Sequence, residues 1–311
     1  MLDILLVVLP VFYILGAGYA SVKFGFFQDE HADILMTFTQ KFAVPCLLFN
    51  ALAKLDLSQV FNPELLISYY TGSAVCFTLG IVGARFIFGR RPGESVVIGF
   101  SALFSNTVLL GLPIMERAFG AQATEPMFAI IAIHTPFCYL LGITTMELFR
   151  ADGRSLPATA LVVVKAMFSN YITVALMIGF AVNLLAIPIH STLQVAIDMM
   201  VRSALPVALF GLGGLLVRYS LTDKFAETSM VVVIRLIVHP GIAYVLSVMV
   251  FDLSEPFVRA AVITAAMAPG VNTYVFANIY ARARGTAASA LLIGTAVSIL
   301  SVSGWLYILN L

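Results

Sequence analysis

Residues 105–114 read SNTVLLGLPI and residues 269–273 read PGVNT, and the expected architecture follows from these two stretches. Each places an Asn-Thr pair beside glycine and proline inside an apolar segment. Proline removes a backbone donor and clashes with the preceding turn, and glycine loosens the backbone. In lipid, backbone groups freed in this way need internal partners or a wet cavity. The pattern therefore predicts two helices that are interrupted in mid-membrane. The residues expected at the breaks are Gly111, Pro113, Pro269 and Gly270.

The composition places the rest of the chain in a membrane. Of 311 residues, 61% are hydrophobic and only 11% are charged, whereas a soluble domain carries about 25% charged residues. A surface so poor in charge must face lipid. The net charge is +1 and the basic residues are scattered, so we expect a lipid bilayer and no nucleic acid as partner. The prediction is an all-α integral membrane protein.

Ten apolar segments approach the length of about 20 residues that spans a bilayer. Their connections are short, and the longest, near Arg150–Pro157, is too small to form a domain. The predicted spans are roughly 3–22, 33–53, 64–88, 95–118, 127–149, 160–186, 191–217, 228–251, 257–281 and 286–309.

Basic residues in the loops predict the orientation, because they concentrate on the cytoplasmic side. The loops after odd-numbered spans hold most of them, which places those loops on the cytoplasmic side and both termini on the outer side of the membrane. The N-terminus lacks the positive region of a signal peptide, so we expect it to remain as the first helix. The odd loops hold Lys23, Arg85, Arg90, Arg91, Arg150, Arg154, Lys165, Arg218, Lys224, Arg282 and Arg284, and the even loops hold Lys54, Arg117 and Arg259.

The second half of the sequence echoes the first. Pro45 in FAVPCLLF and Pro206 in SALPVALF each precede a phenylalanine by four residues, 161 positions apart. The Asn-Thr pairs of the two interrupted spans are 166 positions apart. An odd number of spans per repeat inverts the second copy, which is the plan of many secondary transporters. We therefore expect two inverted five-helix repeats, residues 1–155 and 156–311.

Crossing of the two interrupted helices would create a site for an anion. The amino ends of half-helices carry positive partial charge and unpaired amides, so they bind anions without a buried lysine or arginine. The alternative is that proline and glycine only kink two packed helices. The residues predicted to form the site at these ends are Asn106, Thr107, Asn272 and Thr273.

Several stretches in order along the chain resemble the auxin efflux carrier family, which comprises plant auxin exporters and short bacterial relatives. Besides the two interrupted spans, the resemblance rests on a first, second, seventh and eighth helix. These read GYASVKFGFF (18–27), KFAVPCLLF (41–49), FGLGGLL (210–216) and Arg235 followed by Pro240; the ninth continues as GVNTYVFANIY (270–280).

The resemblance implies ten helices with helices four and nine crossed, as in the elevator folds of sodium/proton antiporters and bile-acid sodium symporters. It implies a scaffold of helices 1, 2, 6 and 7, shaped by Pro45 and Pro206, and a transport domain of helices 3–5 and 8–10. Asn106 would contact a substrate carboxylate, with His134, Tyr139 and Asn272 lining the pocket.

The pocket departs from that of the plant exporters. His134 stands in place of a glutamine, Asn272 in place of an apolar residue, and Cys138 in place of a tryptophan. These changes favour a small polar acid such as malonate over an auxin-like weak acid.

Further polar residues lie within the predicted spans. His134 could hydrogen-bond a carboxylate or carry a coupling proton, or it could be satisfied by neighbouring helices. Asp198 and Arg202 share a helix face, so we expect an ion pair, with ion coupling as the alternative. Arg235 and His239 are also four residues apart, but groups of like sign should not pair. Arg235 is expected to reach a carboxylate such as that of Glu147, or a backbone carbonyl.

Lys41 and Asn50, in the second span, either flank the pocket or extend to the membrane interface. The three cysteines have irregular spacing, which indicates neither disulfides nor a metal site.

No motif of a hydrolase, nucleotide-binding protein or metalloprotease is present in the sequence, so an intramembrane enzyme is the weakest of three hypotheses. The first is a carrier of a small organic anion without a cofactor, coupled to H⁺, to Na⁺ or to no ion. The second is an anion channel or membrane sensor with the same site. A homodimer is left open.

Overall fold

The computed structural model describes residues 2–149, 161, 165, 168, 170–219 and 224–310. Their regular structure is helical, apart from one antiparallel bridge between Ser105 and Pro269. Among them, seven helices are long and apolar enough to cross a membrane. These seven coincide with the first, second, third, fifth, seventh, eighth and tenth predicted spans.

The three other predicted spans differ from a simple membrane helix. The fourth and ninth are interrupted, and the sixth contains a shorter apolar helix, Tyr171–Leu184. The predicted start of the sixth span and the Arg150–Pro157 loop lie outside the described residues.

The chain divides into two compact units, each made of segments that are distant in sequence. The first unit comprises Met1–Leu9, Asn62–Val163 and Tyr219–Leu311, and the second comprises Pro10–Phe61 and Val164–Arg218.

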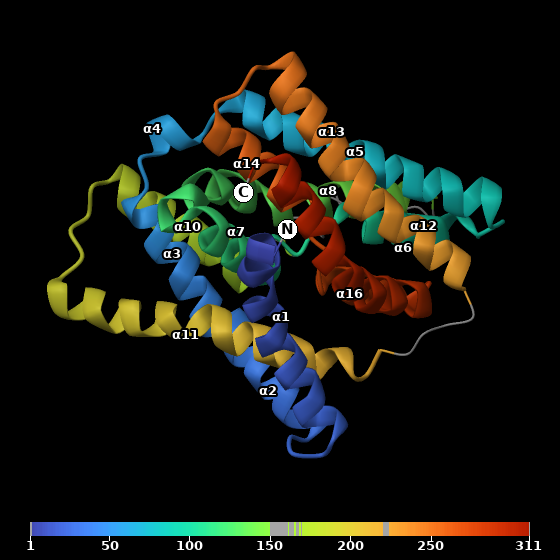
Figure 1. Cartoon of the computed structure of the whole chain (residues 1–311), viewed down its shortest axis with the longest axis horizontal. Helices are drawn as coiled ribbons and strands as arrows, with labels where there is room; N and C mark the ends of the chain where they lie inside the picture. Colours follow the sequence, from blue (N-terminus) through green and yellow to red (C-terminus); the bar gives the residue numbers. More distant parts are fainter. Residues whose placement is uncertain are drawn as a thin grey trace. The chain divides into compact units, whose positions relative to one another are not determined.

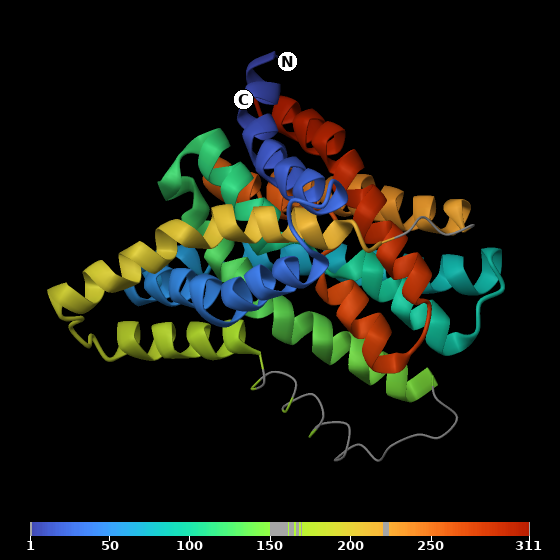
Figure 2. The same ribbon diagram turned by 90° about the horizontal axis from the view of Figure 1, so that it is seen from below.

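The second unit packs through glycine. Figure 2 shows α11 lying along α2 and α3, and α3 also packs against α10. A Cβ on Gly18 of α1 would lie 2.0 Å from the Phe210 carbonyl oxygen of α11, and one on Gly213 would lie 1.9 Å from that of Leu15. Only glycine allows helices to approach so closely. The helices are α1 (Leu2–Lys23, which enters this unit at Pro10), α2 (Asp29–Phe38), α3 (Val44–Lys54), α4 (Leu57–Val60), α10 (Tyr171–Leu184) and α11 (Ser191–Leu216).

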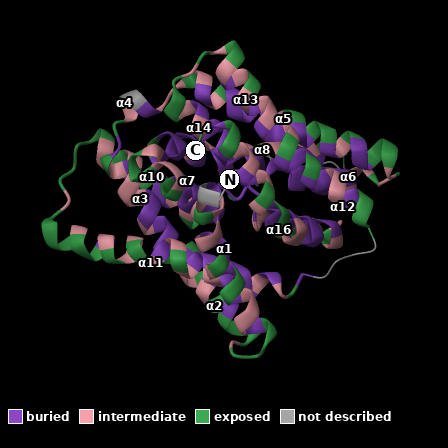
Figure 3. Cartoon of the chain, in the orientation of Figure 1, coloured by how far each residue is buried: buried purple, intermediate pink, exposed green. Residues whose placement is uncertain are grey.

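The first unit contains the interrupted helices. Figure 1 shows α13 beside α5, and Figure 3 shows α6 and α14 as mostly buried, in contrast to α11 of the other unit. Its helices are α5 (Pro63–Val82), α6 (Pro92–Leu103), α7 (Leu112–Phe119), α8 (Glu125–Phe149), α12 (Phe225–Val233), α13 (His239–Tyr244), α14 (Glu255–Ala265), α15 (Asn272–Tyr280) and α16 (Arg284–Ile308).

Proline distorts three of the helices in the same way. A π-helical turn ends two residues before Pro45, Pro113 and Pro240, because the wider turn accommodates a ring that cannot fit a regular α-helix. The turns cover Thr39–Ala43, Thr107–Gly111 and Ile234–Val238. Pro206, in contrast, lies inside α11.

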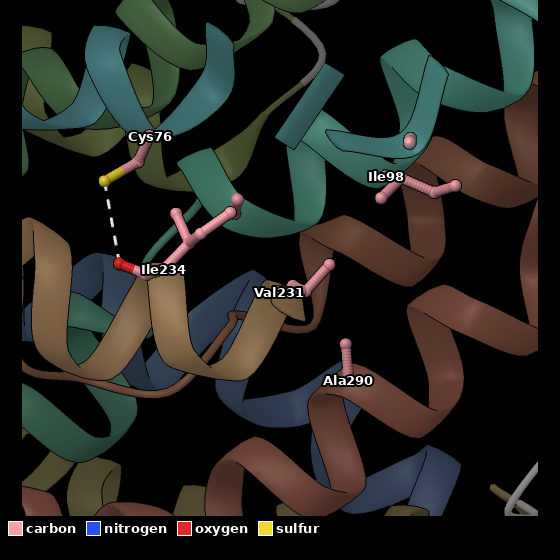
Figure 4. Close-up of a cluster of buried hydrophobic side chains, with 7 residues drawn as sticks. Cys76, Ile98, Val231, Ile234 and Ala290 are labelled. Carbon is pink, nitrogen blue, oxygen red and sulfur yellow. Dashed lines mark hydrogen bonds between the residues drawn. The ribbon is translucent and has the colours of Figure 1, made fainter. Parts of the chain in front are cut away.

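Helix α16 supplies the donors that Pro240 cannot. Pro240 has no N–H for the carbonyl of Leu236, four residues earlier. Ser301 Oγ and Trp305 Nε1 donate to that oxygen at 2.7 and 3.0 Å. Figure 4 shows the neighbouring cluster, where the Cys76 thiol of α5 donates to the Ile234 carbonyl at 3.6 Å. The carbonyls of the distorted turn are therefore satisfied from two helices.

Candidate functional site

Both predicted interruptions are present in the first unit. Helix α6 ends at Leu103, and the chain becomes helical again at Thr107. Helix α14 ends at Ala265, and α15 begins at Asn272. Phe104, directly after α6, has an extended backbone with φ −81° and ψ 114°.

The two interruptions pair through their backbones. The N–H of Asn106 donates to the Ala268 carbonyl at 2.9 Å, and the N–H of Gly270 donates to the Phe104 carbonyl at 3.0 Å. These bonds flank the bridge between Ser105 and Pro269. Each break thus satisfies backbone groups of the other, as a membrane interior demands. We call residues 104–106 and 268–270 the crossover.

Close packing fixes the crossover on both sides. A Cβ on Gly270 would lie 2.9 Å from the Phe104 ring and 3.2 Å from the Ser105 carbonyl oxygen. Behind it, a Cβ on Gly294 of α16 would lie 2.6 Å from Pro269. Gly270 therefore allows the two backbones to meet, and Gly294 allows α16 to support Pro269.

Ser105 ties the crossover to two further elements. Its backbone N–H donates to His134 Nε2 at 3.1 Å, and its hydroxyl donates to the Thr264 carbonyl at 2.9 Å. Because an N–H can only donate, His134 Nε2 must accept, which places the ring hydrogen of the neutral imidazole on Nδ1. Nδ1 lies 3.4 Å from the Tyr69 hydroxyl. His134, 2% exposed, thus has both nitrogens engaged.

Asn106 carries an unused donor. Its side chain is 5% exposed, and Nδ2 has no hydrogen-bond partner among the residues that the structure describes. Its carbonyl accepts from the N–H groups of Leu110 and Gly111 and so begins the next helical segment. Thr107, the first residue of that segment, is 3% exposed. A buried amide at the amino end of a helix is suited to an anionic oxygen.

The second amino end is built by Asn272 and Thr273. The buried Thr273 hydroxyl donates to the Gly270 carbonyl at 2.8 Å, so it shapes the turn. The half-buried Asn272 accepts from the Tyr139 hydroxyl at 3.5 Å. Beside them, α6 and α15 are joined by the stacked rings of Phe100 and Phe276, whose centroids are 3.9 Å apart.

Arg235 lies at the carboxyl ends of both half-helices. Its side chain is 0% exposed, Nε donates to the Met267 carbonyl at 3.1 Å, and Nη1 lies 3.5 and 3.4 Å from the carbonyl oxygens of Ala102 and Leu103. It therefore uses backbone carbonyls, which was one of the two predicted alternatives. Nη2 has no partner within the described part of the chain.

The expectation that Arg235 and His239 do not pair is wrong. Arg235 Nη1 lies 2.5 Å from His239 Nδ1. Since a guanidinium only donates, His239 is a neutral acceptor here, and its other nitrogen, Nε2, lies 3.0 Å from the Tyr69 carbonyl oxygen and donates to it. The prediction failed because it counted histidine as a cation.

The predicted ion pair between Asp198 and Arg202 is also wrong. Asp198 Oδ1 instead accepts from Gln194 Nε2 at 2.7 Å and lies 4.0 Å from Lys54 Nζ. A neighbour one turn earlier and a lysine on α3 compete successfully for the carboxylate.

Asn50 and Lys41, two other predicted residues of the second unit, also have partners within that unit. Gln194 Nε2 donates to Asn50 Oδ1 at 2.8 Å, and Lys41 Nζ lies 5.5 Å from the centre of the Tyr171 ring. Pro45 and Pro206 also belong to this unit.

Sequence reasoning missed Ser105 and Tyr69, which hold the crossover, and it missed the bond from His239 to Tyr69. Ser105 stands directly before the Asn-Thr pair, so its position was a usable signal. Tyr69 and His239 act through bonds between helices that are remote in sequence, and no local spacing reveals such bonds.

Comparisons with known proteins are consistent with this architecture. The family model described as "Membrane transport protein" matches residues 3–306. The "Putative malonate transporter" of Rhizobium meliloti (strain 1021) is 24% identical over all of this chain and 97% of its own length. An "Uncharacterized transporter" of Methanothermobacter thermautotrophicus is 23% identical over 84% of this chain and 85% of its own. The "Auxin efflux carrier component 8" of Arabidopsis thaliana is 24% identical over 49% of this chain and 45% of its own.

Proposed function

Because the chain belongs to the auxin efflux carrier family of membrane transport proteins, we propose that it is a secondary carrier for a small organic carboxylate. The substrate carboxylate binds at the amino ends of the segments that begin at Thr107 and Asn272. The observation that carries this proposal is the buried Asn106 amide, which has no partner among the described residues. An anionic oxygen would satisfy that donor and the positive ends of both half-helices.

A malonate-like acid is the substrate class that we favour. The relative named after malonate aligns over the whole chain, whereas the Arabidopsis auxin carrier aligns over half of it. The polar Asn272 and the compact Cys138 also suit a small acid better than an indole ring. An auxin-like weak acid is the second candidate in the same assay.

Transport follows an elevator mechanism in this proposal. The first unit, which holds the crossover, acts as the transport domain, and the second unit acts as the scaffold. The division of the chain into these units, together with the paired interruptions, supports the mechanism. The protein would lie in a bacterial inner membrane with both termini on the periplasmic side.

Uptake of labelled malonate into proteoliposomes tests the proposal. Asn106→Ala should lower uptake about 10- to 100-fold, because a hydrogen bond to a charged group is lost. Asn278→Ala is the matched control, since Asn278 is exposed on α15, and it should transport like the wild type.

Two results would reject the proposal. Unchanged carboxylate uptake by Asn106→Ala would show that the substrate does not bind at Asn106. Ohmic currents without saturation or counterflow would indicate a channel instead of a carrier.

A further inference from the structure

Arg235 is the one guanidinium found against the crossover among the residues that the structure describes, and its position relative to the helix ends is informative. It contacts the last carbonyls of α6 and the carbonyl of Met267 just after α14. These are the carboxyl ends of the two half-helices, whereas Asn106 and Asn272 mark the amino ends. The positive side chain and the positive helix ends therefore lie on different parts of one backbone junction.

The charges at this junction can be counted. Each half-helix carboxyl end carries about −0.5 elementary charge and each amino end about +0.5. The four ends cancel one another, and Arg235 adds the +1 charge of a guanidinium. The crossover by itself thus carries a net charge of about +1.

The described side chains on which the charge of Arg235 is seen to act carry no negative charge of their own. Nη1 of Arg235 bonds a neutral imidazole, and the other groups are a phenol, two thiols and a second imidazole that accepts a hydrogen bond. Tyrosine and cysteine are neutral at pH 7. The groups are Tyr69 and Cys76 of α5, His134 and Cys138 of α8, and His239 of α13.

We propose that Arg235 is the positioning charge of the crossover: it neutralises both half-helix carboxyl ends and so leaves the amino ends to bind one singly charged carboxylate. The inference rests on the proposed function and narrows its substrate class to monoanions, including the hydrogen form of a dicarboxylic acid. Binding of such a monoanion makes the crossover neutral. A dianion would leave one charge without a counter-charge in a water-poor interior.

A series of related malonate compounds tests the match of charge in the wild-type protein. Malonate carries two charges at pH 7.5, monomethyl malonate carries one and dimethyl malonate none. We expect the monomethyl ester to bind at least as tightly as malonate and the dimethyl ester not to bind. If malonate binds more than about tenfold tighter than the monomethyl ester, a second fixed cation must contribute and the inference is overturned.

Substitution of Arg235 separates charge from structure. Arg235→Gln should weaken the binding of monomethyl malonate about tenfold or more. Arg235→Lys should retain most of the wild-type affinity, because lysine keeps the positive charge although it lacks the guanidinium group. A structural role alone would make both variants equally poor binders. Equal loss in both, or no loss in Arg235→Gln, contradicts the proposal.

Calorimetry on the wild type covers the case in which both variants fail to fold. If the positive charge is the guanidinium, binding of monomethyl malonate in buffers of different ionisation enthalpy should show no proton uptake from pH 6 to 8. Uptake of one proton would assign the charge to His134 or His239 and overturn the inference. Failure of the proposed function looks different, since no carboxylate would then bind at all.

Discussion

His134 lies behind the crossover as an acceptor for the Ser105 N–H. The sequence placed it in the pocket as a binding or proton-carrying residue, and the alternative of a histidine satisfied by its neighbours matches the bonds of both nitrogens. A protonated ring would set a donor against a donor at Ser105. In this arrangement the imidazole supports the backbone that presents Asn106.

We predict different outcomes for two substitutions of His134. Glutamine can place an amide oxygen near the Ser105 N–H, so His134→Gln should retain most of the uptake. His134→Leu leaves that buried N–H without an acceptor, which costs about 1–3 kcal/mol. Uptake assays check the glutamine variant, and thermal unfolding in detergent compares the stability of the leucine variant with that of the wild type. Equal stability of the leucine variant and the wild type would contradict the role assigned to the 3.1 Å bond.

For single residues, the sequence predicted the helix interruptions well and the hydrogen-bond partners of buried side chains poorly. Asn106, Pro269 and Gly270 were predicted because proline, glycine and asparagine have local backbone effects. The Arg235–His239 contact was mispredicted because histidine was counted as a cation, and the partner of Asp198 was mispredicted because several donors compete for its carboxylate. That competition is decided by three-dimensional packing.

At the scale of elements, glycine controls how closely helices pack. In the second unit, the glycines of α1 show two environments: Gly18 faces the Phe210 carbonyl, and Gly16 has no heavy atom within 4 Å of its hypothetical Cβ. This contrast offers a matched pair of substitutions on one helix.

Gly18→Ala should destabilise the protein by about 1–3 kcal/mol, because the added methyl group forces α1 away from α11. Gly16→Ala should be neutral or slightly stabilising, since alanine favours the helix. Melting temperatures of the two variants in the same detergent measure the difference. Similar melting temperatures would show that α1 and α11 do not depend on this contact.

The helices themselves were largely predictable, since apolar length alone identified seven of them. The π-helical turns were not, although three of them end two residues before a proline. Their carbonyls depend on donors such as Ser301 and Trp305 in another helix, which no local rule supplies.

At the scale of the whole molecule, alternating access is the property to test. An elevator must expose the residues around Asn106 to each side of the membrane in turn. The inverted repeat and the two units were inferred from sequence through a proline pair, an Asn-Thr pair and family resemblance. The inverted repeat, the orientation and the motion remain predictions.

Thr107→Cys in a background with serine at positions 46, 76 and 138 provides the test. We expect a membrane-impermeant maleimide to label it from both sides and substrate to slow the labelling, because the site opens alternately. Ser298→Cys, at a site 1% exposed on α16, is the control and should stay unlabelled. Labelling of Thr107→Cys from one side only, under all substrate conditions, would contradict the elevator mechanism.

The two hydrogen bonds that join Phe104 to Gly270 and Asn106 to Ala268 involve main-chain atoms alone. These bonds do not depend on which side chains stand at positions 104, 106 and 268. Substitutions at those positions can therefore change the side chains next to the crossover while the backbone pairing is kept. In evolution, such substitutions allow relatives that share this backbone to bind different ligands.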